Sequence, residues 1–372
     1  MAVQGATLHL ADISTDRRVQ PWRQEIRFCR APDGAQLAFA MAGSGDPLVA
    51  VGGFATHLEY DQEHPWIGPV LAGLKEVSTY LRYDERGEGL SQDGQHDFRL
   101  ARRVRDLEAV VDAAGLDRFA LFGASISGPV AIAYAARHPD RVSHLVLSAT
   151  YARGPALGAD GRREAEAIAG LIGVGWGRSA RLRHILSTAL LPGAGEETVA
   201  WLDDHQHLLT TGPSFAASYL SRVRVDVTAL LRQIRAPTLV LHARDDLVID
   251  FSEAIRLTAA IPGARLIPIE TGGHVWPERG QWQRDVTAID ALIATPRLGA
   301  RSESDLIAVL SVREVDVLDL ASYGLSNSAM AERMCLSVRT VERHLSNIYL
   351  KLQVSGATAR TAAVGMYLRR QS

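Results

Sequence analysis

Short apolar runs alternate with longer helical patterns along this sequence from about Glu25. Six runs are strand candidates, at 47–51, 77–83, 119–122, 144–148, 238–242 and 265–268. Helical patterns lie between them, as at 98–114 and 130–137. Such alternation is typical of an α/β domain in which most strands are parallel. The sequence therefore predicts an α/β fold with a mainly parallel sheet over residues 25–296, preceded by an N-terminal arm at 1–24.

Two further segments complete the predicted organisation, since 372 residues exceed what one hydrophobic core usually organises. Residues 151–235 are too long for a simple crossover and carry helical patterns rich in Leu and Trp, so we expect a helical lid. Its apolar side chains could line a pocket or only pack the lid helices together, and both interpretations stay open. Residues 295–304 contain Pro, Gly and Ser and show no periodicity of apolar residues. We place a linker at 297–304 and a small all-α domain at 305–372.

The basic residues are distributed unevenly. The whole chain has a formal net charge of −2, which taken alone argues against nucleic-acid binding. Residues 333–372, however, contain seven basic residues and one acid, Glu342, for a local charge of +6. The end of the chain is therefore a basic module on an otherwise acidic protein.

The remaining composition bears on compartment and cofactors. No stretch approaches the ~20 continuous apolar residues of a membrane span, and residues 1–20 lack a basic segment followed by an apolar run. The two cysteines, Cys29 and Cys335, are too isolated to form a disulfide framework or a metal site. We therefore expect a cytoplasmic protein with no membrane partner, no metal and no cofactor.

A candidate nucleophile follows the third strand candidate. The run RFALFG leads into Ala124, Ser125, Ile126 and Ser127, and a helical pattern begins directly afterwards. A serine on so sharp a strand-to-helix turn needs small residues two positions away on each side. Gly123 and Ser127 are both small, although a match of this kind is weak by itself.

An acid and a histidine stand where such a serine would need them. Asp246 follows the run TLVLHA, and His274 follows the run RLIPIE. A nucleophilic serine uses a histidine as base and an acid to fix its tautomer, in the chain order Ser, Asp, His. Asp245 is the competing acid.

These residues stand in stretches that resemble the α/β-hydrolase family over roughly 25–294. The stretches are GGF at 52–54, YDERGEGLS at 83–91, FGASISGPVAIAYAARHPDRV, HARDDLV and GGHVWP. The resemblance implies Ser125 as nucleophile, His274 as general base and Asp246 as the orienting acid. It further implies an oxyanion hole made by the backbone amides of Phe54 and Ile126.

Two positions depart from that family's pattern. Gly52 and Gly53 replace the usual His-Gly, which removes a histidine that normally buttresses the loop. Ser127 stands where Gly is usual. Because this fold also serves as a small-molecule receptor, the alternative to an active triad is a retained but idle one.

The end of the chain carries three helix-start signals. Ser311 and Glu314 form an S-x-x-E capping box, and Ser326 and Ser337 begin the next two helical patterns. A short helix at 327–334, a turn at 335–337 and a basic helix at 338–352 together predict a helix-turn-helix that binds double-stranded DNA.

Leu310 to about Tyr367 resembles the LuxR-type (GerE-like) family. The matching positions are Leu310, Arg313, Glu314, Val317, Leu318, Gly324, Leu325, Ser326, Asn327, Ala331, Ser337, Thr340, Val341, His344, Ile348, Lys351, Leu352 and Val354. Gln353 departs from the usual Gly and Ala357 from the usual Arg, which Arg360 could replace. The resemblance implies a homodimer formed through a fourth helix at about 357–368. The alternative is a helical docking module without DNA contact.

Helical geometry over 338–352 separates a buried face from an exposed one. The buried stripe comprises Val341, Leu345, Ile348 and Leu352, which fall within about 60° of arc. The opposite face, expected in the major groove, comprises Arg339, Arg343 and Ser346, with Glu342 and Asn347 at its edges. Thr340 and Lys351 are expected phosphate contacts, and His344 is expected to be packed.

Together these features favour a DNA-binding transcription regulator whose α/β-hydrolase-like domain senses, and could hydrolyse, a small apolar ester, lactone or amide. The main alternative is an active serine esterase with an accessory DNA-binding module. A third interpretation, an interaction protein with two inactive sites, is disfavoured because the triad is complete.

Overall fold

A computed structural model describes the chain at residues 22, 24–53, 55–65, 67–92, 96–270, 273–274, 281–294, 310–334, 336–352 and 359–371. These residues belong to two compact units, Met1–Thr295 and Pro296–Ser372, and each unit is described by itself. The predicted linker at 297–304 and most of the predicted N-terminal arm lie outside the described residues. No helix in the described parts combines the length and the apolarity needed to cross a membrane.

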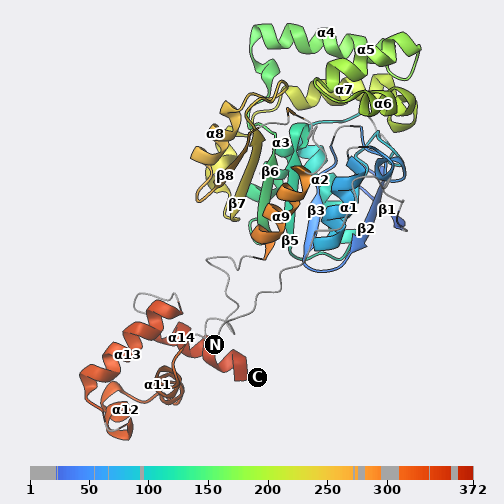
Figure 1. Cartoon of the computed structure of the whole chain (residues 1–372). Helices are drawn as coiled ribbons and strands as arrows, with labels where there is room; N and C mark the ends of the chain where they lie inside the picture. The colour runs from blue at the N-terminus through green and yellow to red at the C-terminus, as the bar shows by residue number, and fades with distance from the viewer. Residues whose placement is uncertain are drawn as a thin grey trace. The chain divides into compact units, whose positions relative to one another are not determined.

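The first unit is built on an eight-stranded, mostly parallel sheet (Figure 1). Its strands are β1 (Glu25–Arg30), β2 (Gln36–Gly43), β3 (Pro47–Ala50), β4 (Thr79–Tyr83), β5 (Phe119–Ala124), β6 (Val142–Ser148), β7 (Thr238–Ala243) and β8 (Arg265–Ile269). They lie in the order β1-β2-β4-β3-β5-β6-β7-β8, and only the β1/β2 and β2/β4 pairs are antiparallel. The α/β fold class is confirmed, whereas β1 and β2 were missed.

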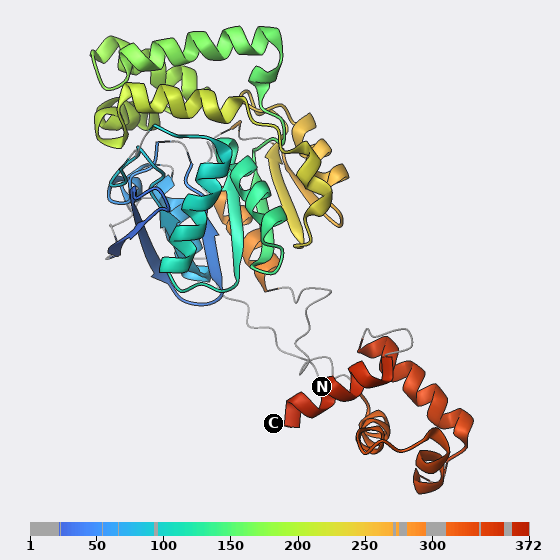
Figure 2. The same ribbon diagram turned by 180° about the vertical axis from the view of Figure 1, so that it is seen from behind.

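Helices cover both faces of this sheet (Figures 1 and 2). On one face pack α1 (Ile67–Val77) and α9 (Gln281–Ile293); on the other pack α2 (Leu100–Ala113), α3 (Gly128–Arg137) and α8 (Ser252–Ala260). Successive side chains of a strand point to opposite faces. Leu121 of β5 therefore joins the core under α2 and α3, while Ala120 and Phe122 join the core under α1 and α9.

A helical lid interrupts the α/β pattern after β6, as predicted. It comprises α4 (Ala159–Gly175), α5 (Ala180–Leu190), α6 (Glu196–Leu209) and α7 (Gly212–Val223), all drawn in green to yellow above the sheet in Figure 1. The lid is attached to the loop after β4: the Gly89 amide donates to the Leu209 carbonyl at 2.7 Å, and the Thr210 hydroxyl donates to the Gly87 carbonyl at 2.5 Å.

The second unit is helical over its described residues and has its own core. Its helices are α11 (Val312–Ser322), α12 (Asn327–Met334), α13 (Val338–Lys351) and α14 (Ala359–Gln371). The capping box at Ser311 and Glu314 is present, and the hydroxyls of Ser326 and Ser337 accept amide hydrogen bonds at the starts of α12 and α13. The stripe predicted as buried on α13 is buried against α11, α12 and α14.

Candidate active site and nucleic-acid interface

Ser125 lies on the sharp turn between β5 and α3. Its φ of +50° is in the left-handed region, which costs a residue other than glycine about 1–3 kcal/mol and persists only where the surroundings enforce it. β5 ends at Ala124 and α3 begins at Gly128, so the chain reverses within three residues. This conformation is the one expected for a nucleophile held at the end of a strand.

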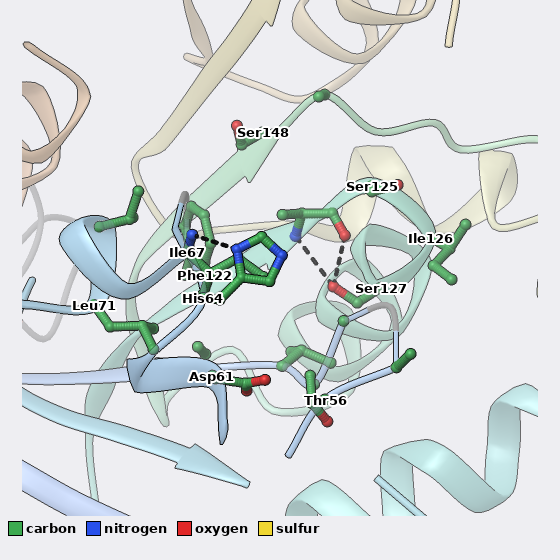
Figure 3. A pocket seen from close by; sticks show the side chains of 18 of the residues that line it. Thr56, Asp61, His64, Ile67, Leu71, Phe122, Ser125, Ile126, Ser127 and Ser148 are labelled. Atoms are coloured by element: carbon green, nitrogen blue, oxygen red, sulfur yellow. Dashed lines mark hydrogen bonds between the residues drawn. The ribbon is translucent and has the colours of Figure 1, made fainter. Parts of the chain in front are cut away.

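Close approach of strand and helix explains the glycines around Ser125. A Cβ at Gly123 would lie 2.6 Å from the Ala131 Cβ, and a Cβ at Gly128 would overlap the Thr150 hydroxyl. Ser127 reinforces the turn: its hydroxyl accepts from the Ala124 amide at 3.1 Å and donates to the Ala124 carbonyl at 2.7 Å (Figure 3). A small residue is therefore required at Gly123, as predicted, and also at Gly128, which had not been predicted.

The three predicted triad residues lie within hydrogen-bonding distance of one another. Ser125 Oγ is 2.7 Å from His274 Nε2, and His274 Nδ1 is 2.9 Å from Asp246 Oδ2. A carboxylate only accepts hydrogen bonds, so His274 carries its proton on Nδ1 and leaves Nε2 free to accept the Ser125 proton. Both distances fall within the range expected for a nucleophile and its base.

The Asp246 carboxylate is fully enclosed, with 0% of its side chain exposed. Oδ1 accepts from the Val248 and Ile249 amides at 2.8 and 3.0 Å, and Oδ2 lies 3.2 Å from His242 Nε2. Burial alone would raise the pKa of Asp246. Hydrogen bonds from His242 and His274 outweigh that effect and hold the pKa of Asp246 well below its usual value. The acid beside His274 is therefore ionised.

Asp245, the competing acid, lies elsewhere. Its carboxylate accepts a hydrogen bond from the Gly273 amide at 3.0 Å, one residue before His274. Asp245 therefore holds the loop, and Asp246 is the residue that contacts His274.

The loop expected to carry the first oxyanion donor reaches the same site. Gly52, Gly53 and Ala55 line the cavity next to Ser125, and so does Ile126, the second predicted donor. Phe54 lies outside the described residues, so its amide stays a prediction. Ala55 has a φ of +48°, a strained conformation of the kind that clusters at active sites.

Ser125 (Figure 3) and His274 line an apolar cavity of about 270 Å³. The lid contributes Leu190, Leu191, Trp201, Leu202, Leu209 and Tyr219 to its wall, and α1 contributes Ile67, Val70, Leu71 and Leu74. Other lid side chains only pack together: Trp176 and Phe215 lie with ring centroids 4.4 Å apart in the lid core. The apolar residues of the lid thus divide between the two roles that the sequence left open.

Polar side chains that were not predicted also line the cavity, among them Asp61, His64 and Arg82, and no motif marks these three. Asp61 and Arg82 form a buried ion pair at 3.0 Å. Burial raises the pKa of Asp61 to about 6, with Arg82 opposing the shift. Burial also lowers the pKa of His64 to about 3, so its imidazole is neutral. Because the Asp61 carboxylate already accepts from Arg82 and the His57 amide, the wall favours an apolar ligand.

The face of α13 that was predicted to lie in the major groove, which we call the reading face, is largely exposed in the second unit. Arg339, Glu342, Arg343, Ser346 and Asn347 are exposed, and Thr340 and His344 are half-buried. The Ser346 hydroxyl donates to the Glu342 carbonyl at 2.9 Å, and the Thr340 hydroxyl lies 2.8 Å from that of Ser337. The exposed arginines are the groups suited to contact DNA.

Lys351 has a partner within the domain. Its ammonium lies 2.6 Å from Glu314, whose side chain is 5% exposed and forms the capping box of α11. This ion pair ties α13 to α11, and the phosphate contact expected of Lys351 stays a prediction.

Arg360 has a structural partner as well. Its guanidinium donates to Asn327 Oδ1 at 2.9 Å and to the Leu325 carbonyl. It therefore joins the start of α14 to the start of α12. Ala357, whose missing guanidinium Arg360 was expected to replace, lies outside the described residues.

Two family models match different parts of the chain. Residues 76–275, more than half of the sequence, match the Hydrolase_4 family, described as serine aminopeptidase, S33. Residues 308–364 match the GerE family, described as bacterial regulatory proteins, luxR family.

Several individual proteins similar to the first unit are named as hydrolytic enzymes. The chain is 30% identical over 253 residues to 2-hydroxy-6-oxo-2,4-heptadienoate hydrolase of Pseudomonas putida, covering 64% of this chain and 84% of that protein. It is 26% identical over 242 residues to pyrrolizixenacetamide deacetylase of Xenorhabdus hominickii, covering 64% and 88%. A solved hydrolase structure from Pseudomonas aeruginosa matches with a TM-score of 0.57 and 27% identity, covering 73% of this chain and 99% of that one.

Proposed function

Because the chain belongs to the α/β-hydrolase family and carries a LuxR-type DNA-binding domain, we propose that it is a one-component bacterial transcription regulator. Its hydrolase-fold domain binds and hydrolyses a small apolar ester, lactone or amide, and occupancy of that site changes DNA binding. One observation carries the proposal: a hydrogen-bonded Ser125–His274–Asp246 triad in the wall of an apolar cavity, on the same chain as a DNA-reading helix.

The hydrolysis follows from the triad geometry. Ser125 Oγ attacks the substrate carbonyl carbon while its proton passes to His274 Nε2. The carbonyl oxygen becomes an oxyanion, which the amides of Phe54 and Ile126 stabilise. His274 then protonates the leaving oxygen or nitrogen, its bond to carbon breaks, and an acyl group stays on Ser125. Water then attacks the acyl carbon while His274 takes its proton, and His274 returns a proton to Ser125 Oγ as the acyl–oxygen bond breaks. The carboxylic acid is released and Ser125 is regenerated.

The polarity of the cavity supports the substrate class. Its wall is apolar apart from side chains that are paired or neutral, and burying each CH₂ group of a ligand is worth about 0.8 kcal/mol. Two relatives, named a deacetylase and a heptadienoate hydrolase, support hydrolysis of carbonyl compounds. We propose a homodimer on two DNA half-sites related by two-fold symmetry, as the LuxR-type resemblance implies.

The alternative is an esterase whose DNA-binding domain only localises it. The two functions differ in one respect. A sensor must bind its ligand with different affinities in two conformational states, because a ligand with equal affinity for both does not shift the equilibrium between them. Measuring DNA affinity with the Ser125 site free and with it occupied therefore separates the two functions.

Replacing Arg343 with alanine is expected to weaken binding to a selected operator by about 1–3 kcal/mol and to relax preference at one base pair per half-site. Arg343 is exposed at the middle of the reading face of α13, where its guanidinium can contact base edges. Titration of an operator and a scrambled duplex with the full chain, at several salt concentrations, measures both quantities.

Arg333→Ala is the matched control, since it removes the same charge from the exposed end of α12. It should alter affinity for both duplexes about equally, as loss of a phosphate contact does. Should Arg343→Ala weaken both duplexes equally while Arg333→Ala changes the preference between them, the orientation of α13 proposed above is wrong.

A further inference from the structure

Four charged side chains, which we call the buried charge cluster, lie in the interior next to the Ser125 turn. Glu85 and Glu88 come from the loop after β4, Arg103 from α2 and Arg222 from the lid helix α7. Each side chain is 2–3% exposed. Glu85 accepts from Arg222 at 2.6 Å and also from Arg103, and Arg222 lies 3.6 Å from Glu88. The cost of removing these charges from water offsets much of the attraction between them, so their net contribution to stability is small. The cluster can instead serve to position the loop that it contacts.

The cluster holds the loop that precedes the predicted oxyanion donor. Arg222 Nη2 donates to the Gly53 carbonyl at 3.3 Å. Glu88 Oε2 accepts from the Thr56 amide at 2.9 Å and from the Thr56 hydroxyl at 3.2 Å. The histidine that usually buttresses this loop is absent from the sequence, and the cluster supplies the support in its place.

Peptide geometry links the direction of a carbonyl to the orientation of its whole peptide unit. A peptide unit is planar and trans, so its C=O and its N–H point in opposite directions. A side chain that holds a carbonyl therefore fixes the orientation of that peptide unit, and Arg222 holds the carbonyl of Gly53.

The second predicted donor is held in the same manner. The Ser125 carbonyl shares a peptide unit with the Ile126 amide, and it accepts a hydrogen bond from the Thr150 hydroxyl at 2.5 Å. Thr150 can approach because Gly128 has no side chain: a Cβ there would overlap the Thr150 hydroxyl. The Gly53 and Ser125 carbonyls are thus each held by a side chain from another segment.

We propose that Thr150 and Arg222 are positioning residues of the oxyanion hole: Thr150 orients the Ile126 amide, and Arg222 of the lid helix α7 fixes the Gly53 carbonyl. The proposal rests on the hydrolytic function proposed above.

The test uses a fluorophosphonate probe, which needs no knowledge of the natural substrate. Ser125 Oγ attacks phosphorus and its proton passes to His274 Nε2; an O–P bond forms, the P–F bond breaks and fluoride leaves. The negative charge that develops on the phosphoryl oxygen uses the same amides as an ester oxyanion. The second-order labelling rate therefore reports the oxyanion hole directly. Thermal unfolding of each variant checks that it is folded.

Thr150→Val removes the hydroxyl and keeps the shape of the side chain. Labelling should slow about 10-fold or more, a part of the 10²–10³-fold that loss of a whole oxyanion donor costs. With p-nitrophenyl butyrate, kcat should fall by a similar factor while KM stays within about two-fold, because the donor acts on the transition state. Thr150→Ser restores the hydroxyl and should return both rates to within about three-fold of the unsubstituted protein.

Arg222→Met is compared with Arg103→Met, a change matched in residue type, burial and the shared Glu85 partner. Arg103 donates to Phe98, Glu85 and Ser218, whereas Arg222 reaches the Gly53 and Ile126 carbonyls. Arg222→Met should slow labelling about 10-fold or more, and Arg103→Met less than about three-fold.

Three results would overturn the inference: unchanged labelling in both Thr150→Val and Arg222→Met, equal slowing in the two arginine variants, or no recovery in Thr150→Ser. In each case Ser125 of the unsubstituted protein still reacts, so the proposed hydrolytic function survives. If the unsubstituted protein itself is not labelled, the hydrolytic function fails and the inference fails with it.

Discussion

Ser125→Ala is expected to abolish labelling by a fluorophosphonate and to lower the turnover of any ester substrate by at least about 10⁴-fold. The left-handed turn holds the Ser125 hydroxyl 2.7 Å from His274 Nε2, and alanine supplies no oxygen to attack the carbonyl. Intact-protein mass spectrometry after labelling counts the attached phosphonates, and peptide mapping locates them.

Ser127→Ala is the control from the same turn. The Ser127 hydroxyl bonds only to the Ala124 backbone among the described residues, so this variant should still be labelled at Ser125. Equal labelling of the Ser125→Ala protein and the unsubstituted one would remove Ser125 from the mechanism.

Asp246→Asn is expected to lower the labelling rate and ester turnover by about 10⁴-fold, although the side chain keeps its shape. The Val248 and Ile249 amides require an oxygen at the Oδ1 position. The new amide NH₂ must therefore face His274 Nδ1, which then has to accept rather than donate. The histidine proton moves to Nε2, and His274 can no longer take the proton of Ser125.

Asp245→Asn makes the same substitution one residue earlier. The Asp245 carboxylate accepts from the Gly273 amide, a bond that the asparagine oxygen can still make, so turnover should fall less than about three-fold. The pH–rate profiles of the two variants, measured side by side, compare their ester turnover. A larger loss in Asp245→Asn than in Asp246→Asn would make Asp245 the orienting acid.

The parallel strands could be predicted from sequence because such strands are buried on both faces. In β7 the run TLVLHA is buried at every position, and it reads as one apolar stretch. β1 could not be predicted: its sequence, EIRFCR, is exposed or half-exposed throughout. It pairs only with β2, at one edge of the sheet. An edge strand with little burial carries no apolar run to recognise.

The triad could be predicted because each member lies in the loop or turn after a strand, and the carboxyl ends of parallel strands meet at one edge of the sheet. The order Ser, Asp, His along the chain and the positions of the strand ends then suffice to predict which residues meet. Arg222 has no such signal, since its contacts with the Gly53 and Ile126 carbonyls depend on how the lid packs. Sequence periodicity likewise placed Lys351 on α13 without revealing Glu314 of α11 as its partner.

A sensor requires that the state of the hydrolase site control DNA binding. This control is measured as the affinity of the full chain for a selected operator duplex before and after Ser125 is converted to its phosphonate. We expect a change in Kd of about 10-fold or more, within the range of 1–3 kcal/mol typical of coupling between sites, and no change in Ser125→Ala treated with the same probe. An identical Kd for the free and the fully phosphonylated protein would contradict the sensor function and leave an esterase with an accessory DNA-binding domain.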